Sequence, residues 1–193
     1  IEKQRLSWEI LDAFRDAAEQ AGIPKTNDFN RGDNEGCDYF QVNQRRGWRW
    51  NTSKAFLRPV KNRPNLQIFT HAQVKKIRIE GGRATGLELR HGRDDATIDA
   101  TNEIILAAGS IGSPQLLQLS GVGPGALLNE HGINVVHELP GVGENLQDHL
   151  QIRCAYKVHG IATLNERANS LLGKIGIGLE YALFRRGPMS MAP

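Results

Sequence analysis

The chain opens with a helical pattern of apolar and polar positions. Apolar residues recur at three- to four-residue spacing over residues 10–21, just after Ser7, whose hydroxyl can cap a helix. Gly22 and Pro24 are typical of the end of such a helix. The pattern therefore predicts one amphipathic helix. A polar, Gly/Asn/Asp-rich stretch follows over residues 26–44, and ordered loops of this length are often functional.

In the middle of the chain the period changes from helical to extended. Apolar and polar residues alternate over much of residues 66–99, interrupted by Gly81-Gly82 and by a polar turn at residues 91–95. Alternation of this kind is typical of strands with one face in water. It predicts a hairpin or a three-stranded meander.

Residues 103–107 (EIILA) have a different pattern, a continuous apolar run. Such a run predicts a strand buried on both faces, as in a parallel sheet. Gly109 follows, and a helix is predicted next, with Ser113 as N-cap and Pro114 at its first position. In open α/β sheets, ligands lie beyond the carboxyl ends of strands, and a helix N-terminus attracts phosphates. The residues alone leave two interpretations open: a cofactor-lining corner, or a plain strand-to-helix turn.

Further elements complete a mixed α and β pattern. The spacing predicts short helices starting near residue 51 and over residues 124–131, and a strand over residues 152–158. Residues 171–184 have helical apolar spacing, although three glycines weaken that helix.

Composition narrows the class of protein. With 193 residues, 39% hydrophobic and 23% charged, the chain suits one domain or parts of two. No apolar run approaches the ~20 residues of a membrane helix, so no transmembrane segment is predicted.

The 24 basic residues are interleaved with 21 acidic ones, which argues against a nucleic-acid partner. Cys37 and Cys154 are isolated, which leaves the compartment open with a lean to a reducing one. A cytoplasmic location is the expectation. Ile1 and Pro193 suggest cuts through a longer chain.

Two motifs carry a family resemblance. Residues 109–123 (GSIGSPQLLQLSGVG) resemble the second signature of the glucose-methanol-choline (GMC) oxidoreductases, and residues 139–149 (LPGVGENLQDH) resemble the segment that follows it there. Three shorter upstream matches fit the same family: Asp28-Phe29-Asn30, Gly47 with Arg49, and Arg63-Pro64-Asn65-Leu66. The resemblance covers roughly residues 7–149 and is closest to the choline dehydrogenase-like branch.

The resemblance implies a mixed α/β fold. It would comprise part of a Rossmann-like FAD-binding domain with an inserted β-meander, plus the start of a substrate-binding domain. Residues 1–149 would belong to the FAD-binding region and residues 150–193 to the truncated substrate-binding region.

The resemblance also implies FAD as cofactor and a small-molecule alcohol as substrate, oxidised by hydride transfer to the flavin. The residues that match cofactor-binding positions of the family are Val74, Ala107, Ala108, Gly109, Asn145 and Asp148. The family's Gly-rich fingerprint would precede this chain, and its catalytic histidine would follow it. No catalytic role is therefore expected for the six histidines present. The isolated chain is expected to be inactive, to bind little FAD and to risk self-association through uncovered apolar surface.

The sequence leaves alternative functions open. Some relatives in the family are flavin-containing cyanohydrin lyases, which involve no net redox change. A cofactor-free binding module is a third possibility. His149 could act as a base, but a loop-orienting role with Asp148 is favoured. The basic and aromatic residues 45–50 could stack on nucleic-acid bases, but packing against neighbouring protein is favoured.

Overall fold

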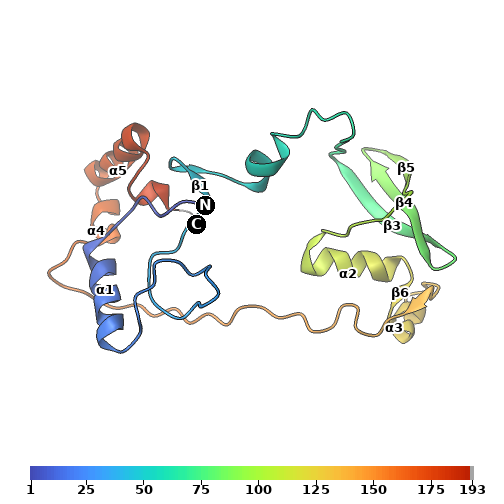
Figure 1. Ribbon diagram of the computed structural model, residues 1–193, viewed down its shortest axis with the longest axis horizontal. Coiled ribbons are helices and arrows are strands. Elements are labelled where there is room, and N and C mark those ends of the chain that lie inside the picture. Colours follow the sequence, from blue (N-terminus) through green and yellow to red (C-terminus); the bar gives the residue numbers. More distant parts are fainter. Residues whose placement is uncertain (192–193) are drawn as a thin grey trace. The chain divides into compact units, whose positions relative to one another are not determined.

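The computed structural model describes residues 1–191, which divide into two compact units. Unit 1 contains Ile1–Leu66 together with the chain from Cys154 onward, and unit 2 contains Gln67–Arg153. Helices and strands occur together, so the predicted mixed α/β class is confirmed (Figure 1). The functional division predicted after residue 149 is a different kind of boundary and stays a prediction.

Unit 2 is built around the predicted three-stranded meander. Strands β3 (Ala72–Glu80), β4 (Arg83–His91) and β5 (Asp94–Asp99) are antiparallel and lie in the order β3-β4-β5. Gly81 and Gly82 both have positive φ and make the first turn, as their sequence predicted.

Helix α2 (Gly109–Leu119) packs against β3. Ile77, Leu89 and Leu116 are the buried large apolar residues of this sheet and α2, where burying each such side chain contributes about 1.5–3 kcal/mol.

The start of α2 differs from the prediction. The helix begins at Gly109 with Ala108 as N-cap, so the prediction of Ser113 as N-cap is wrong, and Pro114 lies inside the helix. The Ser113 hydroxyl instead accepts the backbone N–H of Ala108 at 3.1 Å. Pro114 has no N–H and so removes one helical hydrogen bond, while the Ser113 hydroxyl gives the N–H of the N-cap residue an acceptor that the helix does not provide.

The strand predicted over residues 103–107 is also wrong. This segment has no strand partner within residues 1–191, and Ile105 is 81% exposed. The strand predicted over residues 152–158 is missing for the same reason, since those residues are exposed and unpaired in the described chain. An apolar or alternating pattern suits a strand, but the strand forms only where a neighbour completes its hydrogen bonds.

A small strand-helix-strand unit follows α2. Strand β6 (Val122–Gly123) pairs in parallel with β7 (His137–Glu138), and α3 (Gly125–Glu130) lies between them in sequence. The Glu138 carboxylate accepts the N–H of Gly125 at 3.0 Å, at the N-terminal end of α3. Leu128 on α3 is only 1% exposed. The predicted short helix is therefore confirmed, and its end at Gly132 has the expected positive φ.

Unit 1 combines helices with one short hairpin. Its elements are α1 (Glu9–Gln20), β1 (Gln44–Arg45), β2 (Trp48–Arg49), the π-helix η1 (Ser53–Leu57), α4 (Leu164–Ala168), α5 (Leu171–Phe184) and the 3-10 helix η2 (Pro188–Ser190). The predicted cap Ser7 is wrong by one residue, because the N-cap of α1 is Trp8. The prediction for α5 is confirmed despite its glycines. The Ser170 hydroxyl caps α5 by accepting the N–H of Gly173 at 2.9 Å.

The basic and aromatic residues of the β1–β2 hairpin stack within unit 1. The guanidinium of Arg185 lies 4.3 Å from the ring centroid of Trp48, and the Tyr181 hydroxyl donates to the Gly47 carbonyl at 3.1 Å. The Arg45 guanidinium lies 5.1 Å from the Trp50 ring centroid. These cations are engaged by aromatic faces of the same unit, which supports the packing interpretation of residues 45–50.

Candidate cofactor-binding cavity beside helix α2

A cavity of 440 Å³ lies in unit 2 between β3, the extended segment that precedes α2, and α2 itself. Its lining residues come from β3, from Leu87 of β4, from the extended segment and from α2, which the fold brings together. They are Ala72, Gln73, Val74, Leu87, Ile104, Ile105, Leu106, Ala107, Ala108, Gly112, Gln115, Leu116 and Leu119.

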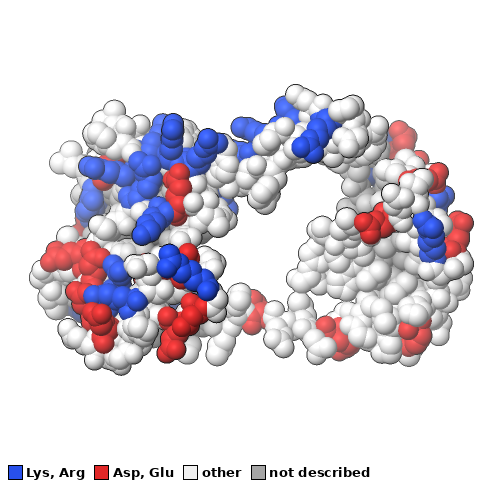
Figure 2. Space-filling view, in the orientation of Figure 1, with Lys and Arg blue, Asp and Glu red and all other residues white. Residues whose placement is uncertain are grey.

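The chemistry of the cavity is apolar with a few polar groups. None of its thirteen lining residues is charged, and only Gln73 and Gln115 have polar side chains. On the face shown in Figure 2, Lys and Arg mix with Asp and Glu elsewhere, while the surface around α2 is largely uncharged. Ligand pockets commonly measure ~300–1,000 Å³ and are mainly apolar with few placed polar groups. This cavity is at the small end of that range and suits part of a large cofactor.

The N-terminus of α2 adds hydrogen-bond donors at the rim. The first four backbone N–H groups of a helix have no intrahelical partner, and that end has positive dipole character. Ala108, the N-cap, is exposed, as are Gly109 and Ser110 in the first turn. A phosphate at this end of α2 would meet donors that the helix itself leaves free.

The structure brings together three of the six predicted site residues. Val74, Ala107 and Ala108 line the cavity. Gly109 follows directly at the helix start, with φ +86°, and a Cβ built there would meet nothing within 4 Å. A side chain at this position would therefore be strained and would enter open space beside Ala108.

The other two predicted residues do not line this cavity. Asn145 and Asp148 are exposed in the loop after β7. Asn145 has φ +58°, a left-handed conformation that asparagine tolerates better than most residues. The Asp148 carboxylate accepts the N–H of His149 at 2.8 Å, as the loop-orienting interpretation expects. The cofactor role of all six residues stays a prediction.

The cavity also contains Gln73, Gly112 and Gln115, which were not predicted as site residues. A signal existed for two of them, since Gly112, Gln115, Leu116 and Leu119 recur at helical spacing and so share one face of α2. Which face looks onto β3 depends on tertiary packing.

The loop that carries Asn145 is tied to α2. The Gln118 side-chain amide donates to the Val142 carbonyl at 3.0 Å. Gly143 has φ +90°, and a Cβ there would lie 2.8 Å from the Gln118 amide nitrogen. A side chain at this position would have to displace the end of the Gln118 side chain, and its positive φ would be strained for any residue other than glycine.

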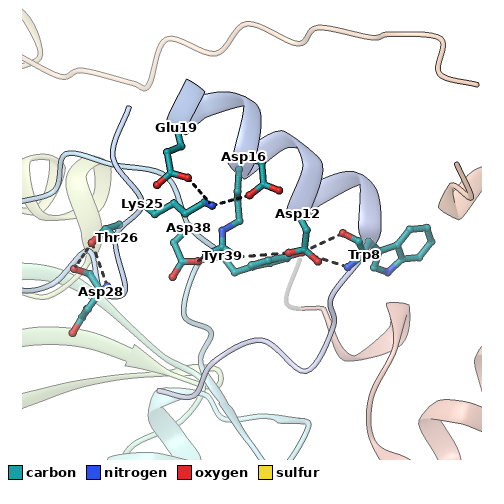
Figure 3. A network of polar contacts seen from close by, with 10 residues as sticks. Trp8, Asp12, Asp16, Glu19, Lys25, Thr26, Asp28, Asp38 and Tyr39 are labelled. Atoms are coloured by element: carbon teal, nitrogen blue, oxygen red, sulfur yellow. Dashed lines mark hydrogen bonds and ion pairs between the residues drawn. The ribbon is translucent and has the colours of Figure 1, made fainter. Parts of the chain in front are cut away.

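A second polar cluster, in unit 1, is structural. The Tyr39 hydroxyl donates to Asp12 at 3.0 Å (Figure 3). Arg15 pairs with Asp38 at 2.9 Å. Burial raises the pKa of Tyr39, which keeps its hydroxyl protonated as a donor. These contacts attach the loop over residues 26–44 to α1. Within the described residues, no group of three or more His, Cys, Asp or Glu could hold a metal ion.

Among residues 1–191, no helix has both the length and the apolar character needed to cross a bilayer. The compartment stays a prediction.

Comparison with known proteins adds family information. The sequence profile of the family described as GMC oxidoreductase matches residues 2–151. The chain is 43% identical over 187 residues to the oxygen-dependent choline dehydrogenase of Brucella ovis, covering 97% of this chain and 34% of that protein. It is also 43% identical over 178 residues to the oxygen-dependent choline dehydrogenase of Photobacterium profundum, covering 92% of this chain and 31% of that protein. The chain thus spans about a third of the length of these relatives.

Solved structures of similar fold point the same way. An FAD-dependent oxidoreductase from Chaetomium thermophilum matches with a TM-score of 0.86 and 29% identity, over 97% of this chain and 33% of that one. A fungal aryl-alcohol oxidase matches with a TM-score of 0.82 and 25% identity, again over 97% of this chain and 33% of that one.

Proposed function

The chain belongs to the GMC oxidoreductase family, and from this premise we propose that the full-length protein is an FAD-dependent oxidoreductase acting on the CH–OH group of a small alcohol. The observation that carries the proposal is the family match over residues 2–151, which contains every wall of the cavity beside α2. The chain covers about a third of its relatives, so activity and substrate belong to the longer protein.

The residues around the cavity fit a flavin nucleotide. The uncharged wall made by Val74, Ala107 and Ala108 would accept a flat, mainly apolar ring system such as adenine. Gly109 has no side chain to block the approach of a bulky group, and the adjacent helix start would bind the anionic diphosphate. This chain would therefore hold one side of the cofactor.

When bound, FAD would supply the redox chemistry by accepting a hydride from the carbinol carbon of the alcohol. The part of this chain is to bind and orient the cofactor. No residue of the chain is proposed to take the hydroxyl proton.

A choline-like alcohol is the proposed substrate class. The support is the 43% identity to oxygen-dependent choline dehydrogenases in two bacteria, Brucella ovis and Photobacterium profundum. The match extends over 97% of this chain and so includes most of residues 150–193, which are proposed to begin the substrate-binding region.

Purified full-length protein tests the proposal by its absorbance. We expect a flavin spectrum that bleaches when choline or a related alcohol is added without oxygen. A spectrum that persists while a cyanohydrin is cleaved would favour the lyase alternative. Colourless protein that fails to bind added FAD would contradict the proposal and favour a cofactor-free binding module.

For the isolated 193-residue chain we propose weak FAD binding and self-association. Several large apolar side chains are almost fully exposed, namely Leu150 (92%), Leu172 (83%), Tyr156 (82%) and Ile105 (81%). Uncovered apolar surface of this kind favours association. Light scattering and flavin fluorescence titration measure the two properties, and a monomer with tight stoichiometric FAD would contradict both.

A further inference from the structure

Helix α2 ends in a buried serine with two hydrogen bonds. Ser120, the C-cap of α2, is 1% exposed. Its hydroxyl donates to the Leu116 carbonyl at 2.6 Å and accepts the backbone N–H of Ile77 at 2.8 Å. The second bond joins residues 43 positions apart and connects the end of α2 to β3.

The hydrogen bond to Ile77 satisfies a backbone N–H on the edge of β3 that no strand pairs with. In the order β3-β4-β5, strand β3 has a strand partner on one side only among residues 1–191. Ile77 is 4% exposed, and a buried N–H without a partner is strongly unfavourable. The Ser120 hydroxyl therefore fixes both the distance and the register between α2 and β3, which apolar packing alone leaves adjustable.

Gln118, on the same end of α2, makes the second tertiary hydrogen bond. Its amide donates to the Val142 carbonyl at 3.0 Å, and Gly143 leaves it room. The loop that it holds leads directly to Asn145. The two side chains thus tie α2 to two other segments that carry predicted cofactor contacts.

We propose that Ser120 and Gln118 are positioning residues for bound FAD. Ser120 sets the place of β3, with Val74, relative to the α2 N-terminus, and Gln118 sets the place of the loop that leads to Asn145. Neither residue lines the cavity, so any influence on the cofactor must pass through these segments. The inference rests on the proposed function, since it requires FAD at the α2 N-terminus.

A pair of variants of equal shape isolates the hydroxyl of Ser120 in the full-length protein. Ser120→Thr and Ser120→Val add the same methyl volume, but only threonine can accept the Ile77 N–H. We expect Ser120→Val to bind FAD about 10- to 100-fold more weakly than Ser120→Thr, by analogy with the loss of supporting hydrogen bonds at metal sites. The visible circular dichroism of the remaining bound flavin should change in Ser120→Val and stay native in Ser120→Thr.

Gln118→Met removes the second bond while keeping the length of the side chain, and it is less buried than Ser120. It should weaken FAD binding and alter the dichroism as well, and it keeps the test open if Ser120→Val does not fold.

Ser190→Ala is the matched control. Ser190 is 2% exposed and its hydroxyl donates to Gly187, but it lies in unit 1. Its loss should leave FAD affinity unchanged.

The outcomes separate this inference from the proposed function. FAD-free wild-type protein would overturn the proposed function and the positioning role with it. Wild-type protein that holds FAD, with equal affinity and dichroism in Ser120→Thr, Ser120→Val and Gln118→Met, would overturn the positioning role alone. Equal losses in Ser190→Ala would show a general stability effect and would also overturn it.

Discussion

Gly109 offers the sharpest test of where the cofactor lies. Its φ of +86° is a conformation that favours glycine, and a Cβ built there meets no protein atom within 4 Å. In Gly109→Ala the only cost within the protein is therefore backbone strain, which is about 1–2 kcal/mol for a non-glycine residue with left-handed φ. This strain lowers the free energy of unfolding but is shared by the free and the FAD-bound protein.

A loss of FAD affinity in Gly109→Ala needs a second cause, a ligand atom at the place of the new methyl group. Inserting a methyl group into a filled contact costs about 1–3 kcal/mol. That energy corresponds to a dissociation constant raised about 5- to 150-fold. Gly109→Val should exceed this effect, because its branched side chain occupies more of the same space.

Gly132 is the matched control for Gly109. It also has positive φ, +68°, and open space around a built Cβ, but it follows the end of α3 and is not at the start of α2. Thermal unfolding and flavin fluorescence titration of the full-length variants measure stability and affinity separately. We expect Gly109→Ala and Gly132→Ala to lose similar stability, and only Gly109→Ala to lose affinity. Unchanged affinity in both Gly109 variants would refute the placement of FAD at this helix start.

Three further predictions concern stability and ionisation. Leu128→Ala should lower the free energy of unfolding by about 2–5 kcal/mol in denaturant titration because Leu128 is 1% exposed. Leu127→Ala should lower it clearly less, because Leu127 is 38% exposed. Equal losses of stability in the two variants would contradict the packing of α3. Tyr39→Phe should lower the free energy of unfolding by about 0.5–1.5 kcal/mol, because it removes the hydrogen bond to Asp12. The raised pKa of Tyr39 gives stability that is present below pH 10.0 and lost as pH rises through the folded pKa. A Tyr39 phenol that titrates at or below pH 10.0 in ultraviolet absorbance would argue against its burial. The hydrogen bond from Lys75 lowers the pKa of Asp95 below 3.8. The small contribution of this pair to stability is therefore present above pH 3.8 and lost as pH falls through the folded pKa. Carboxyl NMR titration should show the pKa of Asp95 rising in Lys75→Met, and an unchanged pKa would refute the pair.

Elements whose sequence pattern lies within one continuous segment were predictable. The meander follows from alternation and the Gly81-Gly82 turn, and both strand pairings appear in the structure. Helix α5 has the predicted bounds because its apolar spacing and its Ser170 cap lie within one continuous segment.

Elements that need a distant partner were not predictable. Residues 103–107 and 152–158 have strand patterns but no pairing partner within residues 1–191. The Ser113 cap was inferred from its position before Pro114, yet α2 starts at Gly109, because glycine can adopt the positive φ from which the helix winds. Propensity is a weak guide where a backbone hydrogen bond or an unusual φ decides the start.

The residues of the candidate site also fall into a group predicted from local motifs and a group identified only by tertiary packing. The motif at residues 109–123 and its neighbour at residues 139–149 were enough to identify the family and to predict Val74, Ala107, Ala108 and Gly109 as cofactor contacts. Only the tertiary structure placed Val74 opposite the start of α2 and showed that Ser120 joins α2 to β3. A motif depends on the order of residues in one segment, whereas a cavity wall depends on packing between segments far apart in the chain, and no local pattern of side chains contains that distance.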